Sequence, residues 1–133
     1  MVELQGYKVN SISFENNVED GAELELQNKF QYNVNYADEE NRCIGMLNFR
    51  VIDSELQGFE IKVDMVAEFS YDDDDEKADI HTESFAQIFP FLRQIICNIT
   101  VSGGMPPLMI PIIRLDRDAV SVNDNTDDES RLS

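Results

Sequence analysis

The feature that most constrains this chain is one long apolar stretch, residues 85–113, FAQIFPFLRQIICNITVSGGMPPLMIPII. Its first part repeats apolar side chains at three- and four-residue spacing. This predicts a helix with Pro90 in its first turn, where a missing N–H costs nothing. Gly103 and Gly104 supply the left-handed backbone that ends many helices. The apolar positions are Ile88, Phe91, Leu92, Ile95, Ile96 and Ile99. Because the polar residues form only a narrow stripe, this helix must bury more than one face.

The second part of the stretch, residues 105–113, is apolar but interrupted by Pro106, Pro107 and Pro111. Proline lacks the N–H that a helix interior or an inner strand needs, so this segment is predicted to follow an extended path. Together the two parts carry more apolar surface than one small subunit is expected to hide. The sequence therefore poses the question of what covers the remainder.

The clearest strand pattern lies earlier in the chain, over residues 24–36. Apolar and aromatic side chains occupy its even positions and polar side chains its odd ones, which predicts a long strand with one dry and one wet face. The even positions are Leu24, Leu26, Phe30, Tyr32, Val34 and Tyr36. Residues 59–71 alternate in the same way, and residues 42–52 carry apolar side chains in both phases.

A further strand is expected over residues 4–14, where the alternation slips at Asn10 and Ser11 and so indicates a bulge. Short connections between the later strands imply antiparallel neighbours. The predicted fold class is α+β, a four-stranded antiparallel sheet with one solvated, acidic face and one long helix packed on the other. Residues 1–115 are expected to form this domain, and residues 116–133 a disordered acidic tail.

Composition limits the classes of partner. The formal net charge of −17 over 133 residues argues against nucleic acid and anionic membranes, which would repel the chain. The N-terminus has no apolar run of signal-peptide length, and no later run approaches a membrane span. Cys43 and Cys97 lie within apolar patterns and are expected to be buried, reduced thiols. A cytoplasmic setting is therefore expected.

Candidate chemistry is sparse. Residues 72–76 are five consecutive acids, but the glycine and the distal glutamate of a calcium loop are absent, so a solvated turn is the preferred interpretation. His81 is the single histidine, and no Cys or other His lies near it in sequence, which disfavours a zinc site. It also lacks a recognisable partner that would make it a general base. No nucleophile motif, phosphate loop or dinucleotide fingerprint is present. We expect no catalytic residue, metal or cofactor.

The helix, its glycine stop and the proline segment resemble the signature of the SecB-type export chaperones. The residues that carry the resemblance are Phe89, Pro90, Phe91, Arg93, Gly103, Met105, Pro106, Leu108 and Pro111. Residues 12–15, ISFE, are similar to the family's first-strand motif, and residues 59–71 to its fourth strand. The likeness covers roughly residues 4–116, and the helix–glycine–proline block is its more specific part.

The resemblance implies a homo-oligomer, either a dimer or a dimer of dimers, that holds non-native polypeptides in apolar grooves without ATP and passes them to the SecA motor. The expected polypeptide-binding residues are Phe85, Phe89, Leu92, Met105, Leu108, Met109, Ile110 and Ile112. Among them the proline-broken segment is the better candidate, because most helix residues are expected to be core, although the same patch can instead seal a dimer. The expected docking residues on an acidic sheet face are Glu15, Glu23, Glu25, Glu60 and Asp64.

Some positions depart from the family. The connection over residues 15–22 is shorter than the family's, the chain has no tryptophan, and Lys62 occupies the position of a SecA-contacting glutamate. An alternative function is therefore an oligomeric adaptor with the same fold, dedicated to one partner protein and lacking general chaperone activity. An enzyme or calcium-binding protein that uses the acidic run is the third and weakest hypothesis.

Overall fold

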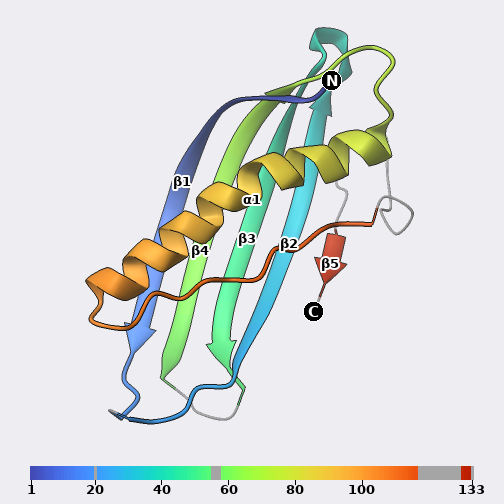
Figure 1. Ribbon diagram of the computed structural model, residues 1–133. Helices are drawn as coiled ribbons and strands as arrows, with labels where there is room; N and C mark the ends of the chain where they lie inside the picture. The colour runs from blue at the N-terminus through green and yellow to red at the C-terminus, as the bar shows by residue number, and fades with distance from the viewer. Residues whose placement is uncertain (20, 55–57, 117–129, 133) are drawn as a thin grey trace.

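The computed structural model describes residues 1–19, 21–54, 58–116 and 130–132. The described strands form one sheet of order β1-β4-β3-β2-β5 in which all neighbours are antiparallel (Figure 1). The elements are β1 (Glu3–Asn16), β2 (Leu26–Ala37), the short 3₁₀ turn η1 (Asp38–Glu40), β3 (Arg42–Asp53), β4 (Phe59–Ser70), α1 (Lys77–Ser102) and β5 (Ser130–Leu132). The predicted fold, a four-stranded antiparallel sheet with one long helix on one face, is confirmed; β5 adds a short fifth strand.

The strand patterns of the sequence correspond to the two faces of this sheet. In β2, Phe30, Tyr32 and Val34 are buried and the residues between them are at least partly exposed. The bulge expected in the first strand is confirmed by a register shift between Val9 and Ser11, and a second shift lies nearer the N-terminus. In β3 the odd positions face the core, so the other apolar phase lies on the outer face.

Gly45 explains how β3 fits against its neighbour. A Cβ atom at this position would lie 2.2 Å from the Tyr32 hydroxyl oxygen, so the absence of a side chain makes room for the Tyr32 ring. The Tyr32 hydroxyl donates a hydrogen bond of 2.6 Å to Ser84 Oγ, and Ser84 Oγ donates to the His81 carbonyl at 3.1 Å. This buried chain of bonds ties the sheet to α1.

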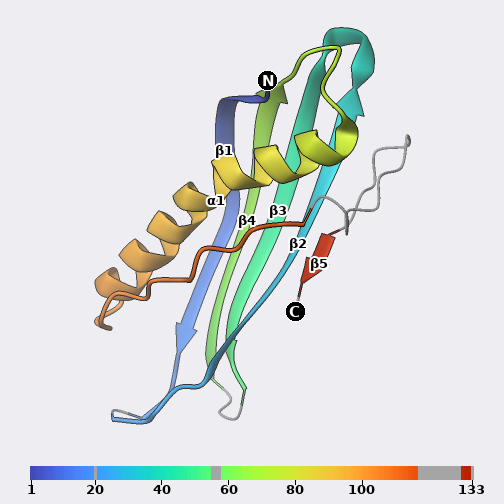
Figure 2. The ribbon, with the colours of Figure 1, turned by 45° about the vertical axis from the view of Figure 1, so that its right-hand side comes forward.

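The start of the helix corrects the sequence analysis. The helix begins at Lys77, so Pro90 lies in its interior and not in its first turn. The apolar spacing in fact continues upstream through Ile80 and Phe85, which are buried against the sheet. Their burial outweighs the hydrogen bond that Pro90 removes. Figure 2 shows that the helix changes direction partway along its length, as expected at an interior proline.

The helix ends where the glycines predict. The Gly103 N–H donates to the Ile99 carbonyl at 2.9 Å. Gly104 has the expected left-handed backbone, with φ +86°. Gly103 has φ −85°, a backbone conformation that any residue can adopt. The left-handed stop is therefore Gly104 alone.

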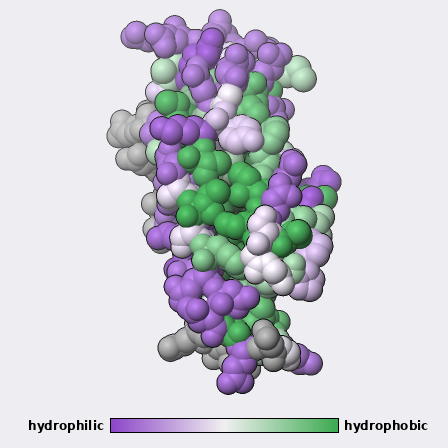
Figure 3. Space-filling view, turned by 90° about the vertical axis from the view of Figure 1, so that its left-hand side faces the viewer, coloured by the Kyte–Doolittle hydropathy of each residue, from purple (hydrophilic) through white to green (hydrophobic). Residues whose placement is uncertain are grey.

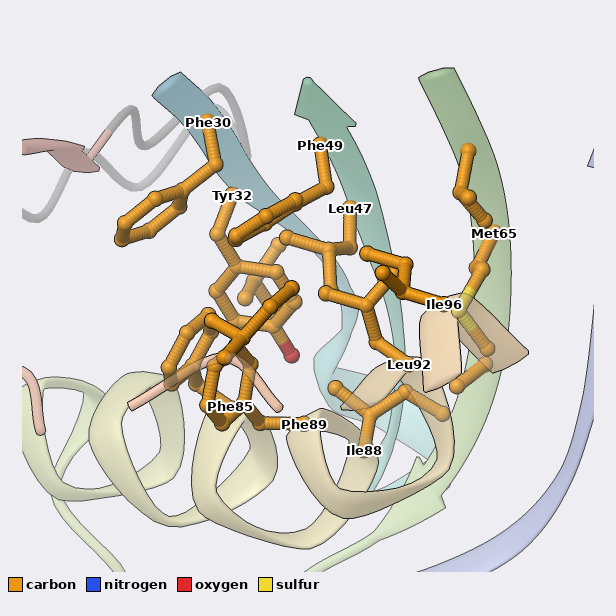
Figure 4. Packing of buried hydrophobic residues seen from close by; sticks show 14 of the residues in the cluster. Phe30, Tyr32, Leu47, Phe49, Met65, Phe85, Ile88, Phe89, Leu92 and Ile96 are labelled. Carbon is orange, nitrogen blue, oxygen red and sulfur yellow. The ribbon is translucent and has the colours of Figure 1, made fainter. Parts of the chain in front are cut away.

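After Gly104 the chain runs back beside α1 on the same face of the sheet (Figures 1 and 2). We call residues 105–116 the strap; they have neither helical nor strand structure, as the prolines predict. Helix and strap together cover the sheet, and the core between them is strongly aromatic (Figure 4). The Phe85 ring stacks on Phe30 at 5.3 Å and on Phe89 at 5.1 Å between centroids.

Other expectations concern the thiols and the tail. Cys43 is buried, Cys97 is half-buried, and both are free thiols. Residues 117–129 and 133 lie outside the described residues, so disorder of the acidic tail stays a prediction. Within that tail, Ser130–Leu132 pairs antiparallel with Phe30–Tyr32 of β2. The described part of the chain has no helix that is both long and apolar enough to cross a membrane.

Candidate functional site

A groove of about 450 Å³ lies between residues 82–93 of α1 and the second half of the strap. Apolar and aromatic side chains make up most of it, and charged groups take part at three positions. The lining residues are Thr82, Glu83, Phe85, Ala86, Phe89, Pro90, Arg93, Ile112, Ile113, Arg114 and Leu115. Such a hollow, largely apolar with a few polar groups, is typical of a site that binds a ligand.

The strap is held to the helix by a few specific bonds. Arg93 Nε donates to the Ile110 carbonyl at 2.7 Å, and the Leu108 N–H donates to Thr100 Oγ1 at 3.0 Å. The Ile110 side chain is 1% exposed and packs into the core. One buried side chain and two hydrogen bonds thus fix the middle of the strap, and residues 112–115 form the wall of the groove beyond it.

The structure brings together only some of the residues expected to bind polypeptide. Phe85, Phe89 and Ile112 line the groove, the two rings as a nearly buried floor and Ile112 as a wall that is 65% exposed. Leu92 and Ile110 belong to the core and present no surface.

The other three expected binding residues lie on the strap outside the groove. Met109 is 63% exposed, and Met105 and Leu108 are half-buried against the core. The strap therefore contributes to the groove mainly through its later residues.

Sequence reasoning identified three of the eleven lining residues and missed the other eight. Thr82, Glu83 and Ala86 were overlooked because the helix was expected to begin at Pro90, whereas the spacing of Ile80 and Phe85 already indicated an earlier start. Arg114 and Leu115 carried no signal, since their role depends on where the strap meets the helix.

The expected acidic docking face is mixed in charge. Glu15 and Glu60 are register partners on the outer face of β1 and β4, and Arg50 Nε donates to Glu60 at 2.9 Å. Asp64, on the same face, accepts a 2.8 Å hydrogen bond from Ser11 Oγ. The remaining two expected residues, Glu23 and Glu25, lie in the connection before β2. Basic residues on this face, Arg42, Arg50 and Lys62, partly offset the acids, and its role as a docking face stays a prediction.

A second apolar surface follows the open edge of the sheet, and Figure 3 shows it as a continuous hydrophobic area. Tyr7 and Ile12 point to the helix side of β1 yet are 44% and 46% exposed. The centroids of the Tyr7 and Phe91 rings are 4.8 Å apart. Phe91 is the first of three apolar residues at four-residue spacing along α1, followed by Ile95 and Ile99. We call this surface the edge patch: Tyr7, Val9, Ile12, Phe14, Phe91, Ile95 and Ile99.

The strand below the edge patch has a free edge. Among the described residues, β1 pairs as a strand only with β4. On its other side the Leu4 N–H donates to Gln87 Oε1, and beyond Leu4 no described strand covers the backbone groups. An open strand edge beside exposed apolar side chains is a surface that proteins normally cover, often with another copy of themselves.

His81 and Cys43, the residue types best suited to acid–base or nucleophilic chemistry, are closed off. His81 is fully buried against the edge of the Tyr32 ring, and burial lowers its pKa to about 4, so it is neutral and out of reach of a substrate. Burial likewise raises the pKa of Cys43 to about 12, which keeps the thiol protonated. Among the described residues, no group of three or more His, Cys, Asp or Glu side chains is placed to hold a metal ion.

Comparison with known proteins gives short sequence matches. No protein-family model matches the chain. The protein-export protein SecB of Anaplasma phagocytophilum (strain HZ) is 29% identical over 73 residues, which cover 50% of this chain and 46% of that protein. The SecB of Ehrlichia canis (strain Jake) is 37% identical over 46 residues, 29% of this chain and 26% of that protein. The chain thus matches less than half the length of either relative.

The fold has a solved counterpart. The SecB-like chaperone Rv1957 of Mycobacterium tuberculosis, in complex with a ChAD peptide from the Rv1956 HigA1 antitoxin, superposes with a TM-score of 0.69. The match covers 84% of this chain and 89% of that one at 13% sequence identity. At this identity the likeness shows the fold, and it confirms the architecture predicted from the sequence.

Proposed function

We propose that this chain, a diverged SecB-type family member, is an ATP-independent chaperone that holds non-native polypeptides in extended form. The observation that carries this proposal is the groove between α1 and the strap, with its aromatic floor and with the strap as its wall. An extended guest can bury apolar side chains against Phe85 and Phe89. The guest's backbone can also pair with the wall, which is how sheet-like surfaces recognise unfolded chains.

The size of the groove suits reversible holding. A guest that buries a few hundred Å² of apolar surface gains roughly 25 cal/mol per Å², and much of that gain offsets the entropy lost on binding. The result is weak, exchangeable binding that needs no ATP to release the guest.

Two equally exposed strap residues test the groove. Ile112→Asp places a charge in the groove, whereas Met109→Asp changes a residue of the same strap that lies outside it. Several unrelated unfolded proteins are diluted into buffer with each variant, and their aggregation is followed by light scattering. Ile112→Asp should lose most of the suppression and Met109→Asp should keep it. Equal suppression by both variants, or none by the original chain, would contradict the proposal.

The alternative, an adaptor dedicated to one partner, is favoured by one comparison. The structural relative was solved with a peptide from an antitoxin, which is a single defined guest. The same aggregation assay separates the two functions: a general chaperone suppresses every client, and a dedicated adaptor suppresses at most one. Hand-off to the SecA motor through Glu15, Glu60 and Asp64 is a weaker extension, because Arg50 and Lys62 offset their charge.

We further propose that a second copy of the chain covers the edge patch. Pairing of two β1 edges would satisfy the open backbone groups and bury the apolar row of α1 in the same contact. Such a self-complementary contact answers the question of what covers the excess apolar surface. The groove lies between α1 and the strap, so it can stay open in this dimer.

Two isoleucines of nearly equal exposure test this interface. Ile12, 46% exposed, lies in the edge patch, and Ile44, 47% exposed, lies on the outer face of β3. Molar mass is measured by light scattering during gel filtration. Ile12→Asp should give a monomer and Ile44→Asp should keep the mass of the original chain. A monomeric original chain, or an unchanged mass for Ile12→Asp, would rule the interface out.

A further inference from the structure

Pro90 leaves an unusual backbone group in the helix. Each carbonyl inside an α-helix accepts a hydrogen bond from the N–H four residues later. Because Pro90 has no N–H, the carbonyl of Ala86 loses its regular donor, and the proline ring also pushes that carbonyl away from the helix axis. A proline inside a helix lowers the stability of the helix by about 3 kcal/mol or more, so its position here calls for an explanation.

The Ala86 carbonyl belongs to the part of the helix that lines the groove. Ala86 and Pro90 are both exposed and both line it, as expected for positions one turn apart on the same helix face. A helical carbonyl points towards the C-terminus, so the Ala86 oxygen is directed at Pro90, between two lining residues. Among the described residues, no side chain donates a hydrogen bond to it.

One long donor of the groove, Arg93, is tied to the strap. Arg93 lines the groove, but its Nε–H is directed to the Ile110 carbonyl of the strap. The apolar floor of Phe85 and Phe89 adjoins the same turn of the helix and limits access of water once a guest is bound. A hydrogen bond made there gains strength from its low-dielectric surroundings.

We infer that the Ala86 carbonyl is a fixed acceptor for one backbone N–H of the bound guest, and that Pro90 is the positioning residue that keeps it available. This inference rests on the proposed function of the groove and adds the guest chemistry: an extended polypeptide with a free backbone N–H at one register position. Every residue except proline supplies that donor, so the contact tolerates almost any sequence. Guests with proline or an N-methylated residue at this position are disfavoured.

The test couples a change in the guest to a change in the chain. The probe is a dye-labelled unstructured peptide with a single central phenylalanine to fix its register, and each of its backbone N–H groups is methylated in turn. Binding is followed by fluorescence anisotropy to the original chain, to Pro90→Ala and to Pro111→Ala. Pro111 is an exposed strap proline outside the groove and so serves as the matched control.

Methylation of the peptide at one backbone position should weaken its binding to the original chain and to Pro111→Ala by about three- to tenfold, which corresponds to the loss of one hydrogen bond. Pro90→Ala restores the helical donor, so it should bind the unmethylated peptide more weakly and show no further loss at that position. Its melting temperature should rise, which excludes misfolding as the cause. The same sensitivity to methylation in Pro90→Ala would overturn the acceptor but leave the groove in place. No binding of the unmethylated peptide to the original chain would overturn both.

Discussion

At the scale of single residues, Gly45 has a packing role that its backbone conformation does not reveal. We expect Gly45→Ala to lower the free energy of unfolding by about 1–3 kcal/mol, because the added methyl group meets the rigid Tyr32 ring rather than a flexible side chain. Urea denaturation measures this loss. Gly6→Ala is the matched control, since a Cβ at Gly6 in β1 meets nothing within 4 Å.

A second background makes this prediction specific. In a Tyr32→Leu chain the ring is gone, so Gly45→Ala should cost much less than it does in the original chain. An equal cost in both backgrounds would show that the strand backbone, and not the ring, requires glycine at this position.

His81 makes stability depend on pH. Its pKa is about 4 in the folded chain and about 6.5 when unfolded, so between these values the unfolded state alone takes up a proton. The stabilising contribution is complete above pH 6.5 and is lost as the pH falls to about 4. The loss should reach roughly 3 kcal/mol in unfolding free energy.

The measurement compares the original chain with His81→Gln by urea denaturation at several pH values from 7.5 to 4. The many carboxylates also titrate in this range, so the informative quantity is the difference between the two chains. That difference should shrink by the predicted amount as the pH falls. A constant difference would mean that His81 titrates alike in both states.

At the scale of elements, the sequence predicted best where one local pattern has one structural meaning. The alternation of Phe30, Tyr32 and Val34 can only be satisfied by a strand with one buried face, and the slip at Asn10 marks a bulge for the same reason. The prediction of the helix start from Pro90 was wrong. Proline prefers the first turn of a helix, but burial of Ile80 and Phe85 against sheet residues that are distant in sequence extends the helix upstream. Sequence preferences give the loss of helix stability caused by an interior proline, but they do not show the tertiary packing that compensates for it.

The strap is an element whose attachment depends on one side chain. Ile110→Asp should destabilise the chain by roughly 2–5 kcal/mol, because it buries an unpaired carboxylate and empties the apolar site that holds the strap. Urea denaturation measures the loss, and hydrogen exchange should show faster exchange at Leu108. The adjacent, exposed Met109→Asp should change little, and equal effects at the two positions would show that the strap is not anchored through Ile110.

At the scale of the whole molecule, the candidate site is assembled from parts that no local pattern connects. Helix positions Thr82 and Ala86 meet strap positions Ile112 and Arg114 only because the chain reverses after Gly104. The sequence could therefore indicate that a proline-rich apolar segment carries function, but not which helix residues face it. Met105 and Met109, the most adaptable of the expected residues, proved to lie outside the groove.

The charge of the molecule adds a kinetic preference to the binding of guests. With a formal net charge of −17, the chain attracts basic polypeptides over long range and repels acidic ones, while contact in the groove remains mainly apolar. Two peptides with the same apolar centre, one flanked by lysines and one by glutamates, should therefore differ in association rate at low ionic strength. Because salt screens this attraction beyond about 10 Å at 0.1 M, the two association rates should converge as salt is added, with dissociation rates nearly unchanged. Stopped-flow fluorescence measures both rates. A salt effect confined to dissociation would instead place the charged contacts inside the groove, at Glu83, Arg93 or Arg114.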